Sequence, residues 1–191
     1  GIRARALLEV FYSTGIRLGE LRRLTLFDCD LQGGLLRVNN GKGAKDRVVP
    51  LGRHAVKFLQ TYLAKVRPRY TSGKRAERCL FIGRLGAPLS QQVVQKTVRK
   101  YARAAGIRKK VTPHTFRHTF ATDLVRNGAE ITAVQRMLGH ANLSVTQLYT
   151  HVAGVEVKKT HRLSHPRERD SAVKEDIAPD IRTVKEPRRR D

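Results

Sequence analysis

The chain has 191 residues, 40% of them hydrophobic, which is enough to bury one sizeable core. Its 39 lysine and arginine residues outnumber its 16 aspartate and glutamate residues, giving a formal net charge of +23. We therefore expect a polyanionic partner, nucleic acid before an anionic membrane surface, and no apolar run approaches the roughly 20 residues that a membrane-spanning helix needs.

The first half of the chain is predicted to form three helices and a hairpin. Apolar residues recur at helical spacing in three segments, and Gly15 separates the first two. LLRVNN and DRVVPL have the composition of strands, and the glycine-rich GKGAK joins them. Pro68 is expected to end the third helix. The helices cover 3–14, 17–24 and 53–67, and the strands cover 35–40 and 46–51.

The second half is predicted to be almost wholly helical. LFIG is a candidate short strand, and AGIRKK, NGAE and GHAN separate the helical patterns that follow it. From Val155 onward apolar content falls and charges of both signs alternate, with one short helix expected in VKKTHRLSHPRERD. The strand covers 80–83, and the helices cover about 90–105, 113–126, 130–138 and 143–150.

These elements indicate an α+β fold that is mainly α, with a small antiparallel sheet. We expect one domain over residues 1–169 and a charged, disordered tail over 170–191. Because the sequence enters a helical pattern directly after Gly1, we also expect an N-terminal part to be missing. Cys29 and Cys79 form no CxxC pair, so we interpret them as reduced, buried thiols of a cytoplasmic protein.

The segment PHTFRHTFAT contains the first candidate site residues. Pro113 follows the N-cap residue Thr112, so a helix starts here and places His114 and Arg117 on one face. A histidine and an arginine in this arrangement can bind a phosphodiester and move a proton on it. HTFRH lacks the glutamate of HExxH, so we expect no metal ion here and interpret His118 as a hydrogen-bonded structural residue.

Two further cations precede this segment. Arg17 follows Gly15 near a helix start, where its guanidinium can meet a phosphate; alternatively it pairs on the surface with Glu20. Glu20 can also be the carboxylate that holds Arg17 in place for a phosphate. Lys42 lies at the tip of the hairpin between glycines, in a loop without Walker A spacing, so the alternative is an ordinary charged turn.

Two further candidate site residues follow the segment PHTFRHTFAT in the chain. His140 comes directly after Gly139, which is expected to end a helix, so its side chain can reach a phosphate or interact with the helix dipole. Tyr149 can act as a nucleophile, although a phenol with a pKa near 10 needs help at neutral pH. The surrounding segment 130–150 also has the pattern of a helix-turn-helix, the structural alternative for this region.

Taken together, these motifs resemble the tyrosine site-specific recombinases of the phage integrase family. TGIRLGELRRLTLFD is similar to the first arginine box of that family, GKGAKDRVVPL to its hairpin lysine element, and HTFRHTFAT with LGHANLSVTQLYTHV to the segment from the second box to the nucleophile. The most similar branch is the Xer recombinases, with integrative relatives near it. The resemblance covers about residues 3–169 and places these residues in the active site, in chain order: Arg17, Lys42, His114, Arg117, His140 and Tyr149.

The chain departs from the family pattern at three points. Phe116 stands where leucine is more common, and residues 171–191 extend past the usual end. We also expect the N-terminal domain that binds the opposite face of DNA in this family to be missing from this sequence.

The resemblance implies a mechanism without a metal ion, ATP or any other cofactor. Arg17, Arg117 and His140 would bind the scissile phosphate, with Glu20 and His118 supporting them. Tyr149 would attack the phosphorus with His114 accepting its proton, to form a 3′-phosphotyrosyl ester. Lys42 would protonate the departing 5′ oxygen.

The resemblance also implies the partners. These are double-stranded DNA, further recombinase protomers in a tetramer of identical or sister chains, and a DNA translocase as a candidate activator in chromosome dimer resolution. Residues of about 152–169 would dock on an adjacent protomer, or alternatively serve as a flexible basic tail that attracts DNA. The competing functions are a non-catalytic helix-turn-helix DNA-binding protein and a type IB topoisomerase.

Overall fold

The computed structural model describes residues 1–39, 46–71, 78–83, 85–139 and 151–169, with side chains of the last segment described from Val157 to Glu168. The strands are β1 (Cys29–Asp30), β2 (Leu35–Val38) and β3 (Arg47–Pro50). The helices are α1 (Ile2–Thr14), α2 (Leu18–Arg23), η1 (Leu26–Asp28), α3 (Arg53–Thr61), η2 (Tyr62–Val66), α4 (Pro68–Thr71), α5 (Gln91–Ala104), α6 (Pro113–Arg126), α7 (Ile131–Leu138), α8 (His151–Ser164) and α9 (Pro166–Arg169).

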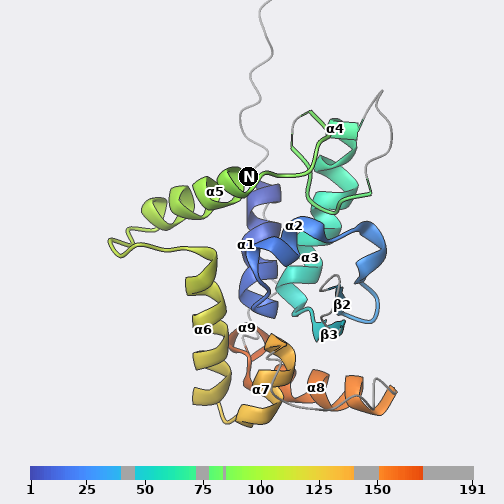
Figure 1. Cartoon of the computed structure of the whole chain (residues 1–191), viewed down its shortest axis with the longest axis vertical. Helices are drawn as coiled ribbons and strands as arrows, with labels where there is room; N and C mark the ends of the chain where they lie inside the picture. Colours follow the sequence, from blue (N-terminus) through green and yellow to red (C-terminus); the bar gives the residue numbers. More distant parts are fainter. Residues whose placement is uncertain (40–45, 72–77, 84, 140–150, 170–191) are drawn as a thin grey trace, which may run out of the picture.

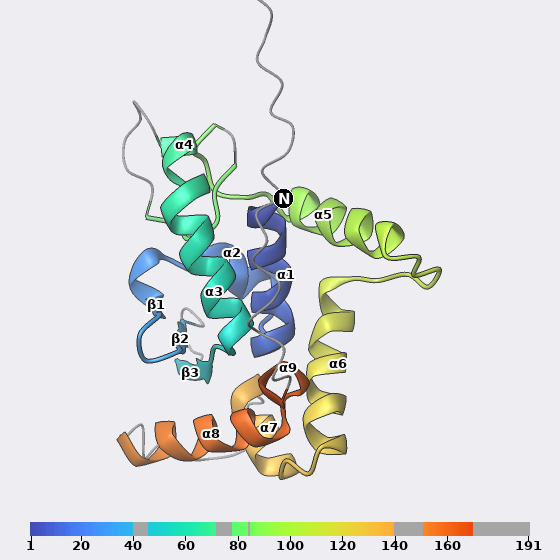
Figure 2. The same ribbon diagram turned by 180° about the vertical axis from the view of Figure 1, so that it is seen from behind.

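Helix α1 is the centre of the fold. It lies between α3 on one side and α6 on the other (Figure 1), and its apolar residues Leu7, Val10 and Phe11 are buried. It ends at Gly15, whose positive φ of 61° allows its N–H to bond the Phe11 carbonyl. Helix α5 projects from one end of the molecule, and α7, α8 and α9 gather at the other end (Figure 2). None of the described helices is long and apolar enough to cross a membrane.

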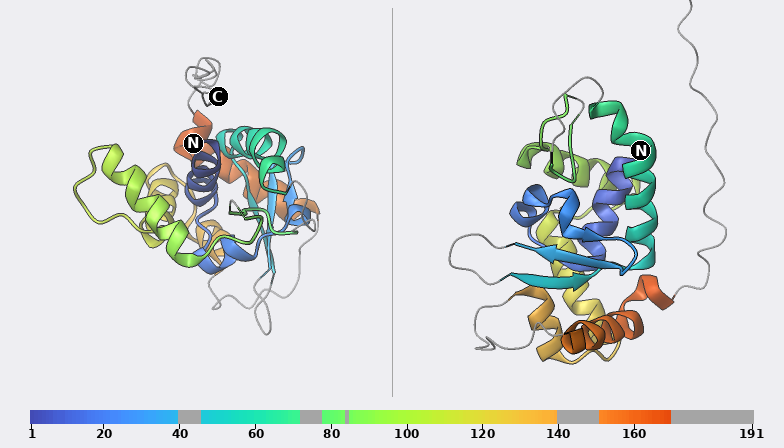
Figure 3. Two further views of the ribbon diagram at one scale, coloured as in Figure 1. Left: turned by 90° about the horizontal axis from the view of Figure 1, so that it is seen from above. Right: turned by 90° about the vertical axis from the view of Figure 1, so that its right-hand side faces the viewer.

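The sheet has three antiparallel strands in the order β1-β2-β3. Residues two apart in a strand share a face, so Arg47 lies on the same face of β3 as the buried Val49. Arg47 is paired across the strands with Val38, which is also buried. Helix α8 contacts β3 and runs below the sheet in the right-hand view of Figure 3. The expected mainly α fold with a small antiparallel sheet is confirmed.

Two predictions about single elements are wrong, one about where a helix ends and one about a strand. Pro68 does not end a helix; α3 passes into the π-helical turn η2 at Tyr62, and Pro68 begins the short helix α4, because the first helical turn tolerates a missing N–H. Residues 80–83 form no strand of the sheet. Cys79 and Ile82 instead make isolated bridges to Thr25 and Pro88. The predicted helix 143–150 lies outside the described residues.

The C-terminal helices pack on their own domain. The His161 and His165 rings are buried and stacked 4.6 Å apart, and their Nε2 atoms lie 2.8 Å from the Ser13 carbonyl and 3.1 Å from the Tyr12 carbonyl of α1. Arg167 also pairs with Glu9 at 3.3 Å. A helix is present where one short helix was expected, but α8 begins earlier, at His151, and a separate helix, α9, follows it at Pro166. The described part of this segment packs on α1 of its own chain, and docking on an adjacent protomer stays a prediction.

Candidate active site

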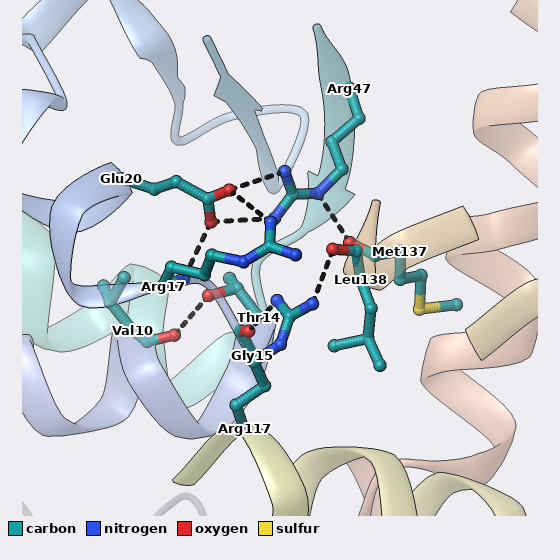
Figure 4. Close-up of polar contacts among 9 residues, drawn as sticks. All are labelled: Val10, Thr14, Gly15, Arg17, Glu20, Arg47, Arg117, Met137 and Leu138. Atoms are coloured by element: carbon teal, nitrogen blue, oxygen red, sulfur yellow. Dashed lines mark hydrogen bonds and ion pairs between the residues drawn. The ribbon is translucent and has the colours of Figure 1, made fainter. Parts of the chain in front are cut away.

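Arg117 of α6 is held by two carbonyl groups. Helix α6 starts as predicted, with the Thr112 hydroxyl accepting a hydrogen bond from the Thr115 N–H and Pro113 in the first turn. One turn further on, the Arg117 Nη1 donates to the Gly15 carbonyl at 2.9 Å and its Nη2 to the Leu138 carbonyl at 2.8 Å. The half-buried guanidinium therefore joins the ends of α1 and α7 (Figure 4).

The charge of Arg117 is not cancelled by these carbonyl partners. Burial, together with the nearby positive charges of Arg17 and Arg47, lowers the pKa of the Arg117 guanidinium to about 10. A group with this pKa is still protonated at neutral pH. A fixed cation next to other cations makes this part of the molecule attractive to an anion.

Glu20 is the carboxylate around which the site is arranged. It is only 3% exposed, and each of its oxygens accepts two hydrogen bonds. The Arg17 N–H donates to Oε2 at 2.7 Å and the Arg17 Nη1 to Oε1 at 3.1 Å. Burial alone would raise the pKa of Glu20, but hydrogen bonds and positive charge from Arg47 and Arg17 outweigh it, so the pKa lies below its ordinary value.

Arg47 is the residue near the site that the sequence predictions missed. Its Nη1 and Nη2 donate to the two Glu20 oxygens at 3.0 and 2.9 Å, and its Nε donates to the Met137 carbonyl at 2.7 Å. It is as buried as Glu20, at 3% exposure. A signal for it existed in the sequence, because strand periodicity in DRVVPL puts an arginine on the same face as Val49, and a buried arginine needs an anionic partner.

Two glycines permit the close approach of these elements. Gly15 has a φ of 61°, and a Cβ atom there would lie 2.5 Å from Cδ1 of Phe120. Gly139 has a φ of 67°, and a Cβ atom there would lie 3.0 Å from Cδ and Nη1 of Arg47. A Cβ atom at Gly15 would force Phe120 to shift, and one at Gly139 would make a tighter than ordinary contact with the Arg47 side chain, so both glycines favour the close approach as well as the positive φ.

The structure brings together part of the predicted site. Arg17 and Arg117 lie near each other, with the Arg17 side chain 46% exposed, so its guanidinium is open to a ligand (Figure 4). His114 is exposed on the first turn of α6. His118 is exposed too, so its structural role stays a prediction without a buried position to support it. Lys42, His140 and Tyr149 lie outside the described residues, and their roles also stay predictions.

Within the described part of the chain, no group of three or more histidine, cysteine, aspartate and glutamate side chains is placed to hold a metal ion. The arrangement of Arg17 and Arg117 can instead bind the non-bridging oxygens of a phosphodiester through charge-assisted hydrogen bonds. Glu20 and Arg47 fix the geometry on one side of this pair, and the carbonyls of Gly15 and Leu138 fix it on the other.

Comparisons with known proteins show which family the chain is similar to. The model of the phage integrase family matches residues 1–155. A protein named tyrosine recombinase XerC, from Pelotomaculum thermopropionicum, is 46% identical over 170 residues, which are 87% of this chain and 55% of the relative. The chain thus spans about half the length of the curated relatives that it matches.

The chain is also similar to solved structures of Xer recombinases. The crystal structure of XerA recombinase is 37% identical with a TM-score of 0.65, over 84% of this chain and 63% of that one. A structure of the XerH site-specific recombinase, bound to a palindromic difH substrate in a post-cleavage complex, is 30% identical with a TM-score of 0.63, over 85% of this chain and 46% of that one.

Proposed function

The chain belongs to the phage integrase family, and from that premise we propose that it is the catalytic domain of a Xer-type site-specific DNA recombinase. The observation that carries the proposal is the pair of guanidiniums from Arg17 and Arg117, fixed by Glu20 and by two backbone carbonyls. A preorganised pair of cations binds a phosphodiester and offsets the charge that develops during its cleavage, without reorganising as the reaction proceeds.

The proposed reaction is a transesterification at phosphorus. The Tyr149 oxygen forms a bond to the scissile phosphorus while the bond to the 5′ oxygen breaks, leaving a 3′-phosphotyrosyl ester and a free 5′-hydroxyl. His114 accepts the tyrosine proton, and Lys42 gives a proton to the departing 5′ oxygen. Arg17, Arg117 and His140 hold the non-bridging oxygens. A 5′-hydroxyl from a second duplex then reverses the step on a new strand.

Each step of this reaction breaks one phosphate ester bond and forms another. The ester to tyrosine replaces the ester to the 5′ oxygen, so rejoining needs neither ATP nor another energy source. In the proposed site, cationic side chains supply the electrostatic stabilisation that a divalent metal ion supplies in many phosphoryl transfers.

The proposed substrate is double-stranded DNA, and the charge of the chain supports it. A net charge of +23 favours binding to the phosphate backbone, and the XerH relative was solved with its DNA substrate. Strand exchange needs more than one active site, so we infer an assembly of recombinase protomers on DNA, with a DNA translocase as a candidate activator. Chromosome dimer resolution is the process that the Xer relatives suggest.

A nicked suicide substrate tests the proposal. A nick just beyond the scissile phosphate releases a short fragment after cleavage, so the covalent intermediate cannot reverse. We expect a protein–DNA adduct that survives denaturation and is lost in Tyr149→Phe and Arg117→Ala. No adduct together with retained specific binding would favour the non-catalytic helix-turn-helix function. Relaxation of supercoiled plasmid without exchange between duplexes would favour a type IB topoisomerase.

A further inference from the structure

We propose that Arg47 is a positioning residue that sets the geometry of the phosphate-binding arginine Arg17 through Glu20 and ties it to the turn at the end of α7. This inference rests on the proposed function, and it concerns a residue outside the set that the sequence and the family resemblance supplied. It is carried by three observations: the bonds that Arg47 makes, its burial, and the charge balance around Glu20.

Arg47 connects two parts of the site with one side chain. Its two Nη atoms donate to both oxygens of Glu20, and its Nε donates to the Met137 carbonyl in the last turn of α7 (Figure 4). A planar guanidinium can make a bidentate bond to a carboxylate and a third bond in another direction at the same time. A lysine ammonium is a point charge and cannot reproduce this geometry.

Burial assigns Arg47 to positioning rather than to contact with the substrate. Its side chain is 3% exposed, whereas that of Arg17 is 46% exposed. The two guanidiniums that bond Glu20 therefore have different roles: that of Arg17 is open to a ligand, and that of Arg47 is buried and bonds only protein groups among those described. Gly139 packs directly on Arg47, because a Cβ atom there would lie 3.0 Å from its Cδ and Nη1.

Charge gives Arg47 a second effect. Glu20 by itself would cancel the positive charge of Arg17 and would repel a phosphate. Arg47 neutralises Glu20, so the carboxylate can orient Arg17 without removing the net positive charge of the site. With Arg117 nearby, three guanidiniums surround one carboxylate, and the excess positive charge remains for the ligand.

The test uses Arg47→Lys and Arg47→Gln in the complete chain, with Arg37→Lys as a matched control. Arg37 lies on the neighbouring strand β2 and makes an exposed ion pair with Asp46. Arg47→Lys retains the charge and loses the fork geometry, whereas Arg47→Gln loses both. We expect single-turnover adduct formation at saturating nicked DNA to fall roughly 10- to 100-fold in both Arg47 variants, because misplaced catalytic groups cost about this much. Affinity for the DNA should stay at the wild-type value in Arg47→Lys, which keeps the charge, and fall in Arg47→Gln, which leaves the charge of Glu20 without this partner.

A second measurement does not depend on catalysis. The Arg17 N–H donates to Glu20 Oε2 at 2.7 Å, so its hydrogen exchange reports how firmly Glu20 is held. We expect this amide to exchange faster in Arg47→Lys than in the wild type, while the buried amides of α1 keep their protection. Arg37→Lys should change neither the exchange nor the adduct rate.

The outcomes separate the two proposals. If the wild type forms no adduct, the proposed function fails, and the exchange of the Arg17 amide still decides whether Arg47 positions Arg17. If the wild type forms an adduct and Arg47→Lys matches it in rate and exchange, the positioning role is refuted. Faster exchange throughout α1 and α2 in Arg47→Lys would also refute it, because that result describes a residue needed for general stability.

Discussion

Replacing Gly15 by alanine tests whether close packing between α1 and α6 builds the site. Two costs are expected. An L-residue at a φ of 61° is strained, and the new Cβ atom would lie 2.5 Å from Cδ1 of the buried Phe120. Left-handed strain costs about 1–2 kcal/mol and overpacking about 1–3 kcal/mol, so we expect Gly15→Ala to lower the free energy of unfolding by about 2–5 kcal/mol.

Gly106→Ala is the matched control. Gly106 has a similar φ of 72°, but nothing lies within 4 Å of the position its Cβ would take. This variant should therefore show only the backbone strain, about 1–2 kcal/mol. Urea unfolding followed by circular dichroism gives both values, and the thermal midpoint of Gly15→Ala should fall by roughly 5–15 °C.

The comparison also bears on function. The Gly15 carbonyl accepts a hydrogen bond from Arg117 Nη1, so moving the end of α1 should displace this guanidinium and slow adduct formation more than the loss of stability explains. Equal costs for Gly15→Ala and Gly106→Ala would refute the reasoning, because they would mean that Phe120 gives way and that the close approach is not needed.

Three further predictions follow from the described contacts. Glu20→Gln should slow adduct formation at unchanged DNA affinity, because it leaves the cation Arg47 buried without its anion. Burial lowers the pKa of His161 and His165 from 6.5 to about 4, so the free energy of unfolding should be greatest above about pH 6.5 and fall as the pH drops toward 4. Urea unfolding at several pH values measures this dependence, which should become weaker when both histidines are replaced by glutamine. Leu124→Ala in the core should cost about 2–5 kcal/mol, whereas Leu163→Ala, at 64% exposure, should cost under about 0.5 kcal/mol.

Local patterns in the sequence predicted local features of the fold. Thr112 and Pro113 identified the start of α6, and the spacing of Arg17 and Glu20 placed them within reach of each other. Both predictions depend on residues three or fewer positions apart. The boundary at Pro68 was wrong because a proline is tolerated at the start of a helix as well as after its end.

Features that depend on distant segments could not be predicted in the same way. Arg47 bonds Glu20 across 27 positions and Met137 across 90, and no local pattern encodes those partners. His161 and His165 fall in a stretch whose composition indicates a charged, exposed segment, yet their rings are buried against the carbonyls of α1. In both cases the tertiary contact determines the environment of a polar side chain.

The end of α1 also constrains the order in which the protein can mature. The carbonyls of Tyr12, Ser13 and Gly15 are hydrogen-bond partners of His165, His161 and Arg117, which lie 153, 148 and 102 positions further along the chain. Each of these contacts requires that the whole intervening chain has been made, and closing so long a loop costs conformational entropy. A nascent chain that has reached Arg126 contains Arg17 and Arg117 but not the Leu138 carbonyl that fixes Arg117. In such a chain the Arg117 guanidinium lacks one of its two carbonyl partners and is not yet fixed in the position that it takes in the folded protein.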